Sequence, residues 1–299
     1  MSTTRTPRVV AVTGASSGVG RATAIAFGRR GDAVALIARA EDALHAAARD
    51  VEAAGGRALA VPCDVSDFEA VDAAAERIER ELGPIDVWVN DAMAAVFGFV
   101  WETDPADVRR VTEVSYLGFV HGTIAALRRM RPRDRGVIVQ VGSALAYRAI
   151  PLQATYCASK FAIRGFTDSL RCELLHDGSG VRLTMVQLPG LNTPQFDQVR
   201  NLLPRRPRPV APVFQPEVAA DAIAWAADHP RREVHVGANT AVIVALNKLF
   251  PGLADRYLAR TNVEAQQTAQ PKLDRGDYLY APLPGDPGAH GRFDDEAKQ

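Results

Sequence analysis

Apolar, β-branched runs alternate with longer helical patterns along most of this 299-residue chain, and this order constrains the fold more than any other feature. Strands are expected at residues 8–13, 33–38, 57–62, 85–90, 136–142, 181–188 and 233–236. Helices are expected at residues 19–30, 41–54, 68–82, 105–130, 155–176 and 216–227. Parallel strands joined by helices form right-handed crossovers that cover both faces of a sheet. The order therefore predicts an α/β fold, a doubly wound parallel sheet of about seven strands with helices on both faces.

The charge balance and the residue usage exclude several classes of protein. Lys and Arg number 35 and Asp and Glu also number 35, so the basic surplus typical of nucleic-acid-binding proteins is missing. The six His residues show no metal-ligand spacing, and no apolar run approaches the ~20 residues of a transmembrane helix. Three cysteines do not make a disulfide framework, and the N-terminus lacks the apolar stretch of a signal peptide. We therefore expect a cytoplasmic protein with no bound metal, no nucleic-acid partner and no transmembrane segment.

A glycine-rich turn, TGASSGVG, leaves the first expected strand and enters the first expected helix. Glycines let the backbone approach a pyrophosphate closely, and the helix N-terminus supplies unpaired N–H groups and a positive dipole end. An ordinary tight turn is the simpler interpretation, but the place at the first strand-to-helix junction favours a dinucleotide and a Rossmann-type fold. The residues expected to contact the dinucleotide here are Gly14, Ser16, Ser17, Gly18, Val19 and Gly20.

The end of the second expected strand indicates which dinucleotide binds. An acidic residue there would bind the adenosine ribose and repel a 2′-phosphate, but the chain has Ala38 and Arg39. Arg39 can pair with a 2′-phosphate, which favours NADP(H) over NAD(H); the alternative is a solvated loop arginine. Asp64 and Val65, after the third strand, and Asn90, at the end of the fourth, are expected at the adenosine end of the site. Asp64 and Asn90 could instead be helix caps.

Tyr156 and Lys160 lie four residues apart near the start of an expected helix, so both side chains project from one helical face. A free tyrosine has a pKa of ~10, and lowering it to roughly 7 requires about 4 kcal/mol of differential interaction. A close, partly desolvated ammonium favours the phenolate and can supply that energy. Ser143 ends the fifth strand, where its hydroxyl can donate to a substrate oxygen in the same crevice. These three residues predict acid–base chemistry at one site.

Taken together, the motifs resemble those of the short-chain dehydrogenase/reductase family. They are Thr13-Gly14-x-x-x-Gly18-x-Gly20, Asn90, Ser143, Tyr156-x-x-x-Lys160 and Pro189-Gly190-x-x-Thr193. The resemblance runs over residues 8–237, and five motifs in the right order on the right elements make coincidence improbable. It implies an NAD(P)-dependent oxidoreductase that acts on CH–OH groups and assembles as a homodimer or homotetramer.

The resemblance also implies a mechanism, in which NADPH delivers hydride to a carbonyl carbon in the reductive direction. Tyr156 would protonate the carbonyl oxygen as general acid, and Ser143 would hold that oxygen. Lys160 would lower the pKa of Tyr156 and bind the nicotinamide ribose. The residues expected against the nicotinamide carboxamide are Pro189, Gly190 and Thr193.

Two positions depart from the family's pattern. The usual Asn-Asn-Ala-Gly is replaced by residues 90–93, NDAM, so Met93 puts a flexible thioether where a glycine allows close approach. Ser115 stands where the family has an asparagine that helps to hold a water in a proton relay. We hypothesise that Ser115 is a catalytic residue of a rewired relay, which uses a second water or exchanges protons more slowly.

The residues expected around the substrate are largely apolar, which favours a lipophilic carbonyl or secondary alcohol, although such side chains more often fill a core. They are Val96, Phe97, Phe99, Leu145, Tyr147, Ile150, Leu152, Leu191 and Phe196. The Pro- and Arg-rich residues 193–215 form the expected substrate loop, which cannot be a regular helix or a central strand. Its arginines either meet an acidic group of a ligand or are solvated; they are Arg200, Arg205, Arg206 and Arg208.

We expect residues 1–237 to form one Rossmann-type NAD(P)-binding catalytic domain. Residues 238–299 are expected to be an extension and not an independent domain. A helix over 240–261, interrupted or kinked at Pro251, and an extended or loosely ordered Pro- and Gly-rich tail over 271–299 are its expected parts.

Two other functions fit the same motifs. One is a dehydratase or epimerase of the same fold, which uses NAD(P) without net turnover. The other is an NADPH-sensing binding protein that has lost catalysis, an alternative motivated by Met93 and Ser115.

Overall fold

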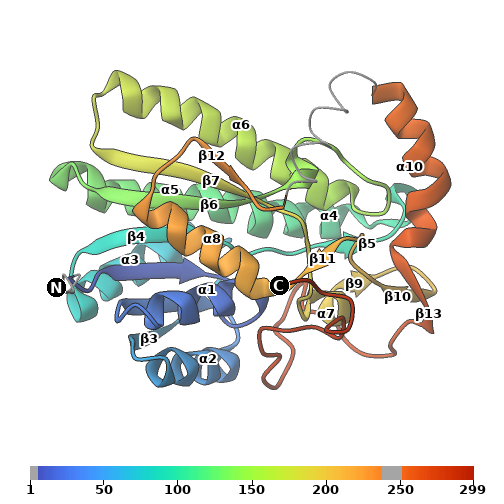
Figure 1. The fold of residues 1–299 in the computed structure, drawn as a ribbon, viewed down its shortest axis with the longest axis horizontal. Helices are drawn as coiled ribbons and strands as arrows, with labels where there is room; N and C mark the ends of the chain where they lie inside the picture. The colour runs from blue at the N-terminus through green and yellow to red at the C-terminus, as the bar shows by residue number, and fades with distance from the viewer. Residues whose placement is uncertain (1–5, 238–250) are drawn as a thin grey trace.

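The structure, a computed structural model, describes residues 6–237 and 251–299. The strands of its central sheet are β1 (Val9–Thr13), β2 (Ala33–Ala38), β3 (Arg57–Pro62), β4 (Ile85–Asn90), β6 (Gly136–Ser143), β7 (Val181–Leu188) and β12 (Glu233–His235). They lie in the order β12-β7-β6-β4-β1-β2-β3, and each neighbouring pair is parallel (Figure 1). The predicted doubly wound, seven-stranded parallel sheet is confirmed.

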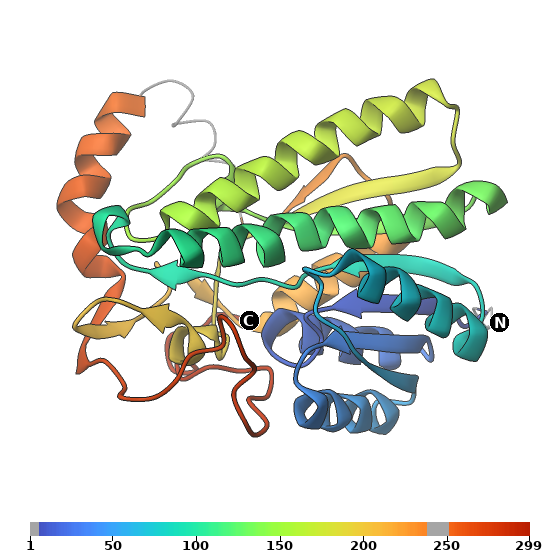
Figure 2. The ribbon, with the colours of Figure 1, turned by 180° about the vertical axis from the view of Figure 1, so that it is seen from behind.

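Helices cover both faces of the sheet (Figures 1 and 2). One face packs against α1 (Gly18–Gly28), α2 (Glu41–Ala53) and α8 (Pro216–Asp228). The other face packs against α3 (Phe68–Leu82), α5 (Gly118–Met130) and α6 (Ala154–His176). Two large hydrophobic clusters, one on each side of the sheet, form the core between these layers.

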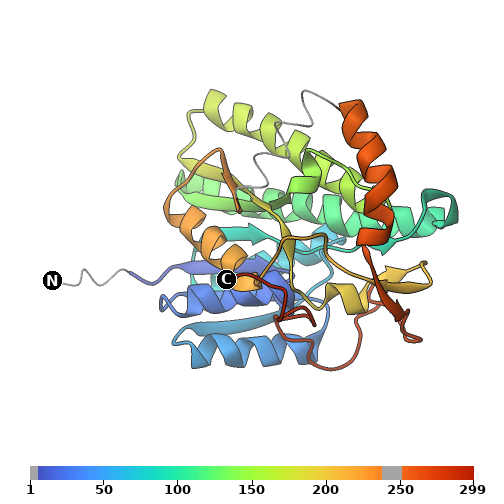
Figure 3. The ribbon, with the colours of Figure 1, turned by 45° about the vertical axis from the view of Figure 1, so that its right-hand side comes forward.

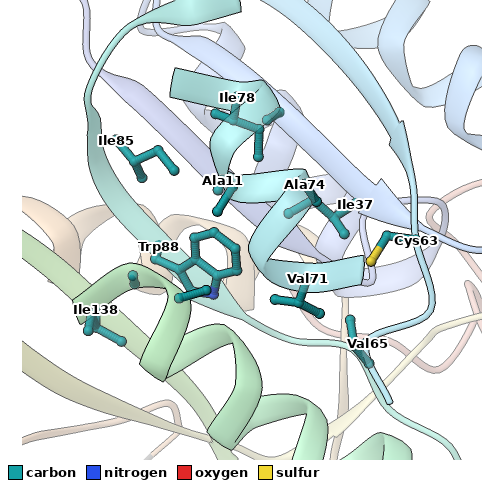
Figure 4. Close-up of a cluster of buried hydrophobic side chains, with 14 of the residues drawn as sticks. Ala11, Ile37, Cys63, Val65, Val71, Ala74, Ile78, Ile85, Trp88 and Ile138 are labelled. Atoms are coloured by element: carbon teal, nitrogen blue, oxygen red, sulfur yellow. The ribbon is translucent and has the colours of Figure 1, made fainter. Parts of the chain in front are cut away.

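The central strand β1 shows why the sequence folds in this way. All five of its residues are buried, and successive side chains of a strand point to opposite faces. Val10 and Val12 therefore lie in the cluster under α1, whereas Ala11 faces the cluster around Trp88 and Ile78 (Figure 4). A strand buried on both faces reads as the continuous apolar run seen in the sequence.

The helix expected over residues 105–130 is interrupted. It consists of α4 (Pro105–Thr112), a π-helical segment η2 (Glu113–Leu117) and then α5. Asp104 caps its start as expected, because its carboxylate accepts from the Ala106 N–H at 2.8 Å. The π segment carries Ser115, and single π turns inside helices occur frequently at functional sites.

Short elements build an additional layer beyond the carboxyl edge of the sheet. They are β5 (Val96–Phe97), η1 (Val100–Glu102), η4 (Ala144–Ala146), β8 (Gly190–Leu191), α7 (Gln195–Gln198), β9 (Arg200–Asn201), β10 (Arg205–Pro207), β11 (Val213–Phe214), α10 (Pro251–Ala265) and β13 (Gln267–Pro271). A further short helix, η3 (Arg131–Arg133), lies at the opposite edge, between α5 and β6. As expected, the segment 193–215 holds neither a long helix nor a central strand. The helix expected over 240–261 is described only from α10 onward, and its earlier part lies outside the described residues.

The C-terminal tail, residues 271–299, packs on the body of the protein, so of the two expected alternatives it is extended and not loosely ordered (Figure 3). Leu279 is 0% exposed within the cluster around Val65, and Phe293 is buried beside Phe196. The chain ends beside β11, where the Lys298 N–H donates to the Val213 carbonyl at 2.9 Å. Buried apolar side chains and backbone hydrogen bonds thus hold this Pro- and Gly-rich segment on the protein.

Loop arginines also fasten this tail. Arg200 pairs with Asp277 at 2.9 Å, and Arg208 pairs with Glu296. Arg205 pairs with Glu264, just before the tail. These arginines therefore meet acidic groups of the protein's own extension, a partner that the sequence analysis did not consider.

We expect Leu279→Ala to lower the free energy of unfolding by about 2–5 kcal/mol, because it leaves a cavity in the main core. Leu253→Ala is the matched control, since Leu253 is 62% exposed and its truncation leaves no cavity. Urea unfolding of both variants measures the difference. A Leu279→Ala protein as stable as the control would show that the tail is not docked in solution.

Candidate active site

A cavity of about 680 Å³ lies where the parallel strands end. Ligands of open α/β sheets bind outside the carboxyl ends of the strands, and segments that follow β1, β2, β3, β4, β6 and β7 all line this cavity. The predicted residues that line it are Gly14, Ser16, Ser17, Gly18, Val19, Arg39, Asp64, Val65, Ser143, Tyr156, Lys160, Pro189, Gly190 and Thr193. The structure therefore brings most of the predicted site together.

The glycine-rich turn approaches other backbone so closely that side chains are excluded. Gly14 has a φ of +73°, and a Cβ there would lie 2.9 Å from the Ala92 Cα. A Cβ on Gly20 would lie 2.3 Å from the Gly14 carbonyl oxygen. Gly20 does not line the cavity, and its closeness to Gly14 packs the turn against the start of its own helix; its contact with a dinucleotide stays a prediction.

Tyr156 and Lys160 project from adjacent turns of α6 toward Ser143 at the end of β6. The Lys160 ammonium lies 5.6 Å from the centre of the Tyr156 ring and 4.7 Å from that of Phe119. It donates a hydrogen bond to the Val141 carbonyl at 2.8 Å. The Ser143 hydroxyl accepts from the Leu145 N–H at 3.1 Å and is hydrogen-bonded to the Tyr156 phenol. A phenol, an ammonium and a hydroxyl thus share one cavity wall.

Burial dominates the ionisation of this group. It raises the pKa of Tyr156 above its ordinary value, and the hydrogen bond with Ser143 opposes that rise. Burial also lowers the pKa of Lys160. We predicted that the Lys160 ammonium lowers the pKa of Tyr156. For this to happen, the attraction between ammonium and phenolate must exceed the cost of burying the phenolate.

Asp91 is a buried carboxyl group of the site that the sequence analysis did not single out. Burial raises its pKa and the nearby Lys160 ammonium opposes that rise, while Asp91 in turn raises the pKa of Lys160 and of Tyr156. The signal was present in the sequence, because Asp91 replaces the second asparagine of the family's Asn-Asn-Ala-Gly.

Asn90 does not reach the cavity, which corrects its predicted contact with the adenosine end. The side chain is 0% exposed, and its amide accepts from Trp88 Nε1 at 2.8 Å and donates to Gln140 Oε1 at 2.9 Å. A further hydrogen bond reaches Thr123 on α5 at 3.1 Å. These bonds use the amide fully, so Asn90 fixes the end of β4 against its neighbours.

Ser115 was predicted to be a catalytic residue of a proton relay, but its side chain faces the backbone of Ala94 and not the cavity. Its hydroxyl donates to the Ala94 carbonyl at 2.7 Å and accepts from the Ala94 N–H at 2.8 Å. It is 0% exposed and does not line the cavity. Because its one proton is held by a backbone carbonyl, Ser115 positions the segment after β4 and does not shuttle protons to the site.

The adenosine side of the cavity carries a cluster of charged groups. Asp64 accepts from Arg110 at 2.5 Å and from the Ser66 hydroxyl at 2.8 Å. The Arg39 guanidinium donates to three backbone carbonyl oxygens of the tail, those of Tyr278, Leu279 and Tyr280. Arg39 is therefore neither a freely solvated arginine nor one paired with a carboxylate.

The apolar side chains expected around the substrate divide into two groups. Those that line the cavity are Phe97, Leu145, Ile150, Leu191 and Phe196. The others lie in the core or away from the cavity; they are Val96, Phe99, Tyr147 and Leu152. Gln153 and the α10 residues Tyr257 and Leu258 complete the wall.

The family model described as short chain dehydrogenase matches residues 8–202. The chain therefore belongs to the short-chain dehydrogenase/reductase family. A protein of Bacillus subtilis (strain 168) named uncharacterized oxidoreductase YxnA is 33% identical over 270 residues, which cover 90% of this chain and 76% of that protein.

Two solved structures have the same fold. The alcohol dehydrogenase of the archaeon Thermococcus sibiricus, complexed with 5-hydroxy-NADP, matches with a TM-score of 0.67 and 25% identity over 76% of this chain and 95% of its own. A short-chain dehydrogenase/reductase of Burkholderia phymatum in complex with NAD matches with a TM-score of 0.73 and 24% identity, over 83% and 95% of the two chains. The chain is an oxidoreductase of this family, and NAD(P)-dependent oxidoreduction is its class of reaction.

We expect Asp91→Asn to shift the alkaline limb of the kcat/KM profile to lower pH. The neutral amide removes the carboxylate that raises the pKa of Lys160, so Lys160 loses its proton at a lower pH. Initial rates across the pH range measure the shift, with Asp42→Asn on the exposed start of α2 as control. An alkaline limb that stays in place or moves upward would contradict the coupling.

Proposed function

We propose that the protein is an NADP(H)-dependent oxidoreductase that transfers hydride between nicotinamide and a lipophilic carbonyl or secondary alcohol. The observation that carries the proposal is the convergence of Ser143, Tyr156 and Lys160 on a cavity that also holds the glycine-rich turn. The turn fits a dinucleotide because residues 16–19, at the N-terminus of α1, line the same cavity, and a helix N-terminus favours an anionic group such as a phosphate. When bound, the nicotinamide supplies or accepts the hydride.

In this proposal the chain's own residues position the substrate and move one proton. The Ser143 hydroxyl donates to the substrate oxygen, and the Tyr156 phenol gives its proton to that oxygen in reduction and takes it back in oxidation. The Lys160 ammonium stabilises the phenolate that reduction leaves behind. The apolar wall from Phe97, Leu191 and Phe196 supports a lipophilic substrate.

The preference for NADP(H) rests on the charges around Arg39. Two guanidinium groups, Arg39 and Arg110, face a single carboxylate, Asp64, which leaves a net positive charge at the adenosine end. The carbonyl oxygens that Arg39 contacts are neutral, so they leave its charge uncompensated. An anionic 2′-phosphate is favoured at such a place.

We propose that residues 1–237 and the extension form one catalytic unit that assembles as a homodimer or homotetramer. Exposed Ile124 on α5 and Phe161 on α6 support an assembly, since large apolar side chains there would be covered. The cysteines of the described residues are all free, which supports the cytoplasmic location. Among the described helices, none is both long and apolar enough to cross a membrane.

Tyr156→Phe is expected to lower kcat/KM about 10²- to 10⁴-fold while NADPH still binds, because only the proton donor is removed. Steady-state assays follow the absorbance of the reduced nicotinamide, and its fluorescence reports binding. Full activity of the variant would overturn the role of Tyr156. Conversion of a substrate without net change in the nicotinamide would favour a dehydratase or epimerase, and NADPH binding without turnover would favour the sensing protein.

Arg39→Asp is expected to lower the NADPH-to-NADH ratio of kcat/KM at least about tenfold, the effect of losing a charge-assisted hydrogen bond. Arg29→Asp, an exposed change at the end of α1, is the control. Arg39→Asp also removes the hydrogen bonds from Arg39 to the tail. Thermal unfolding of the cofactor-free variant measures the stability lost with these bonds, separately from the lost contact with the 2′-phosphate. An unchanged ratio would show that Arg39 does not select the dinucleotide.

A further inference from the structure

Three buried amide side chains, Gln153, Gln266 and Asn262, form a hydrogen-bonded row beside the active-site cavity, which we name the amide chain. Gln153 Nε2 donates to Gln266 Oε1 at 2.6 Å, and Gln266 Nε2 donates to Asn262 Oδ1 at 2.9 Å. Gln153 directly precedes α6, Asn262 lies on α10, and Gln266 directly follows α10. Gln266 is 0% exposed, whereas Gln153 and Asn262 keep 9% and 6% of their surface and line the cavity.

Backbone carbonyl groups fix which atom of each amide donates. Gln266 Nε2 also donates to the Pro151 carbonyl at 2.9 Å and to the Asn262 carbonyl at 3.1 Å, which an amide oxygen could not do. The Gln266 oxygen therefore faces Gln153 and accepts from its nitrogen, and the Asn262 oxygen accepts from the Gln266 nitrogen. The two ends of the amide chain are thus an acceptor, Gln153 Oε1, and a donor, Asn262 Nδ2.

Both ends of the amide chain lack a partner and are open. The described residues give neither Gln153 Oε1 nor Asn262 Nδ2 a hydrogen bond, and neither atom is among the unpartnered polar atoms that the protein encloses. Gln153 stands at the N-cap of α6, yet its side chain makes no capping hydrogen bond. Polar groups of residues buried to more than nine-tenths normally have partners, and a ligand in the cavity would supply them here.

The amide chain lies on the side of Tyr156 that faces away from the glycine-rich turn. Gln153 comes before Tyr156 on the helix and Lys160 comes after it, and seven residues separate the outer two by about 10 Å along the axis. The Lys160 end faces the turn, because residues 91–92 both raise the pKa of Lys160 and approach Gly14. The Gln153 end faces α10, which lies far from α2 in Figures 1 and 3. A dinucleotide on the turn therefore leaves the amide side of the cavity to the substrate.

We propose that Gln153 and Asn262 are specificity-determining residues that bind a hydroxyl group of the substrate. The hydroxyl donates to Gln153 Oε1 and accepts from Asn262 Nδ2, so it satisfies both ends at once, whereas an ether or ketone oxygen would leave the Gln153 acceptor unpaired. This rests on the proposed function, in which Tyr156 and Ser143 hold the reacting oxygen, and it names the substrate class. That class is a lipophilic ketone that carries a hydroxyl group, or in the oxidative direction the corresponding diol.

The test compares 8-hydroxyoctan-2-one with nonan-2-one, in which a methyl group replaces the hydroxyl. Pairs shortened by one and by two methylene groups vary the distance between the carbonyl and the hydroxyl. Binding to the NADPH-loaded protein is measured by calorimetry in a Tyr156→Phe background, where the probe is not consumed. We expect one pair at least to show tighter binding of the hydroxyketone, because the methyl group leaves the buried amides unpaired.

Gln153→Met, which keeps the length of the side chain but removes the acceptor, is expected to lower the hydroxyketone-to-ketone affinity ratio of that pair about tenfold. Asn262→Leu is expected to act in the same direction, and Gln266 keeps its two backbone acceptors in that variant. Gln270→Met is the matched control, since Gln270 is exposed on β13 and does not line the cavity.

The other outcomes separate this inference from the proposed function. Equal binding of the two members of every pair, or a ratio that Gln153→Met leaves unchanged, overturns the inference alone. An unchanged ratio with a lower midpoint of urea unfolding would show that the amide chain only fastens α10. A variant that weakens NADPH binding and not the ratio would assign Gln153 to the dinucleotide. Failure of every probe to bind would contradict the lipophilic substrate of the proposed function, and this inference with it.

Discussion

A buried ammonium at the carboxyl edge of the sheet is the interaction on which the rest of the site depends. Lys160 is 3% exposed, and a buried cation persists only where hydrogen bonds and opposite charge compensate the water that it loses. The Val141 carbonyl, the Phe119 ring and the Asp91 carboxyl group supply that compensation from three different elements. The acidic residue at position 91 therefore belongs to the same electrostatic unit as the lysine, and it also raises the pKa of Tyr156.

The sheet, most helices and the Tyr156–Lys160 pair could be predicted because each depends on short-range pattern. A doubly buried strand such as β1 appears as a continuous apolar run, and a spacing of four residues places two side chains on one face of a helix. The same holds for the cap at Asp104, whose partner is two residues away. Local chemistry specifies these features whatever surrounds them.

The roles of Asn90 and Ser115 could not be predicted, because their partners are distant in the sequence. Asn90 bonds to Gln140, 50 positions on, and Ser115 bonds to Ala94, 21 positions back. Whether an amide or hydroxyl faces the cavity or the core depends on which neighbour satisfies it, and family position alone does not contain that information. The π segment that turns Ser115 toward Ala94 likewise leaves no mark in the apolar periodicity.

The tail illustrates the same limit on a larger scale, and it also shows what the extension adds to the family's fold. Its composition left open whether it is extended or loosely ordered, and Leu279 and the acidic partners of the loop arginines fix it across the site. At Arg39 and Gly18 the tail offers only neutral carbonyl oxygens. Charge-assisted hydrogen bonds are roughly twice as strong as neutral ones, so an anionic phosphate competes well for both groups. In the proposed NADP(H) complex, phosphate groups would replace these carbonyl oxygens, while the buried Leu279 side chain and the Asp277–Arg200 pair would still hold the tail on the protein.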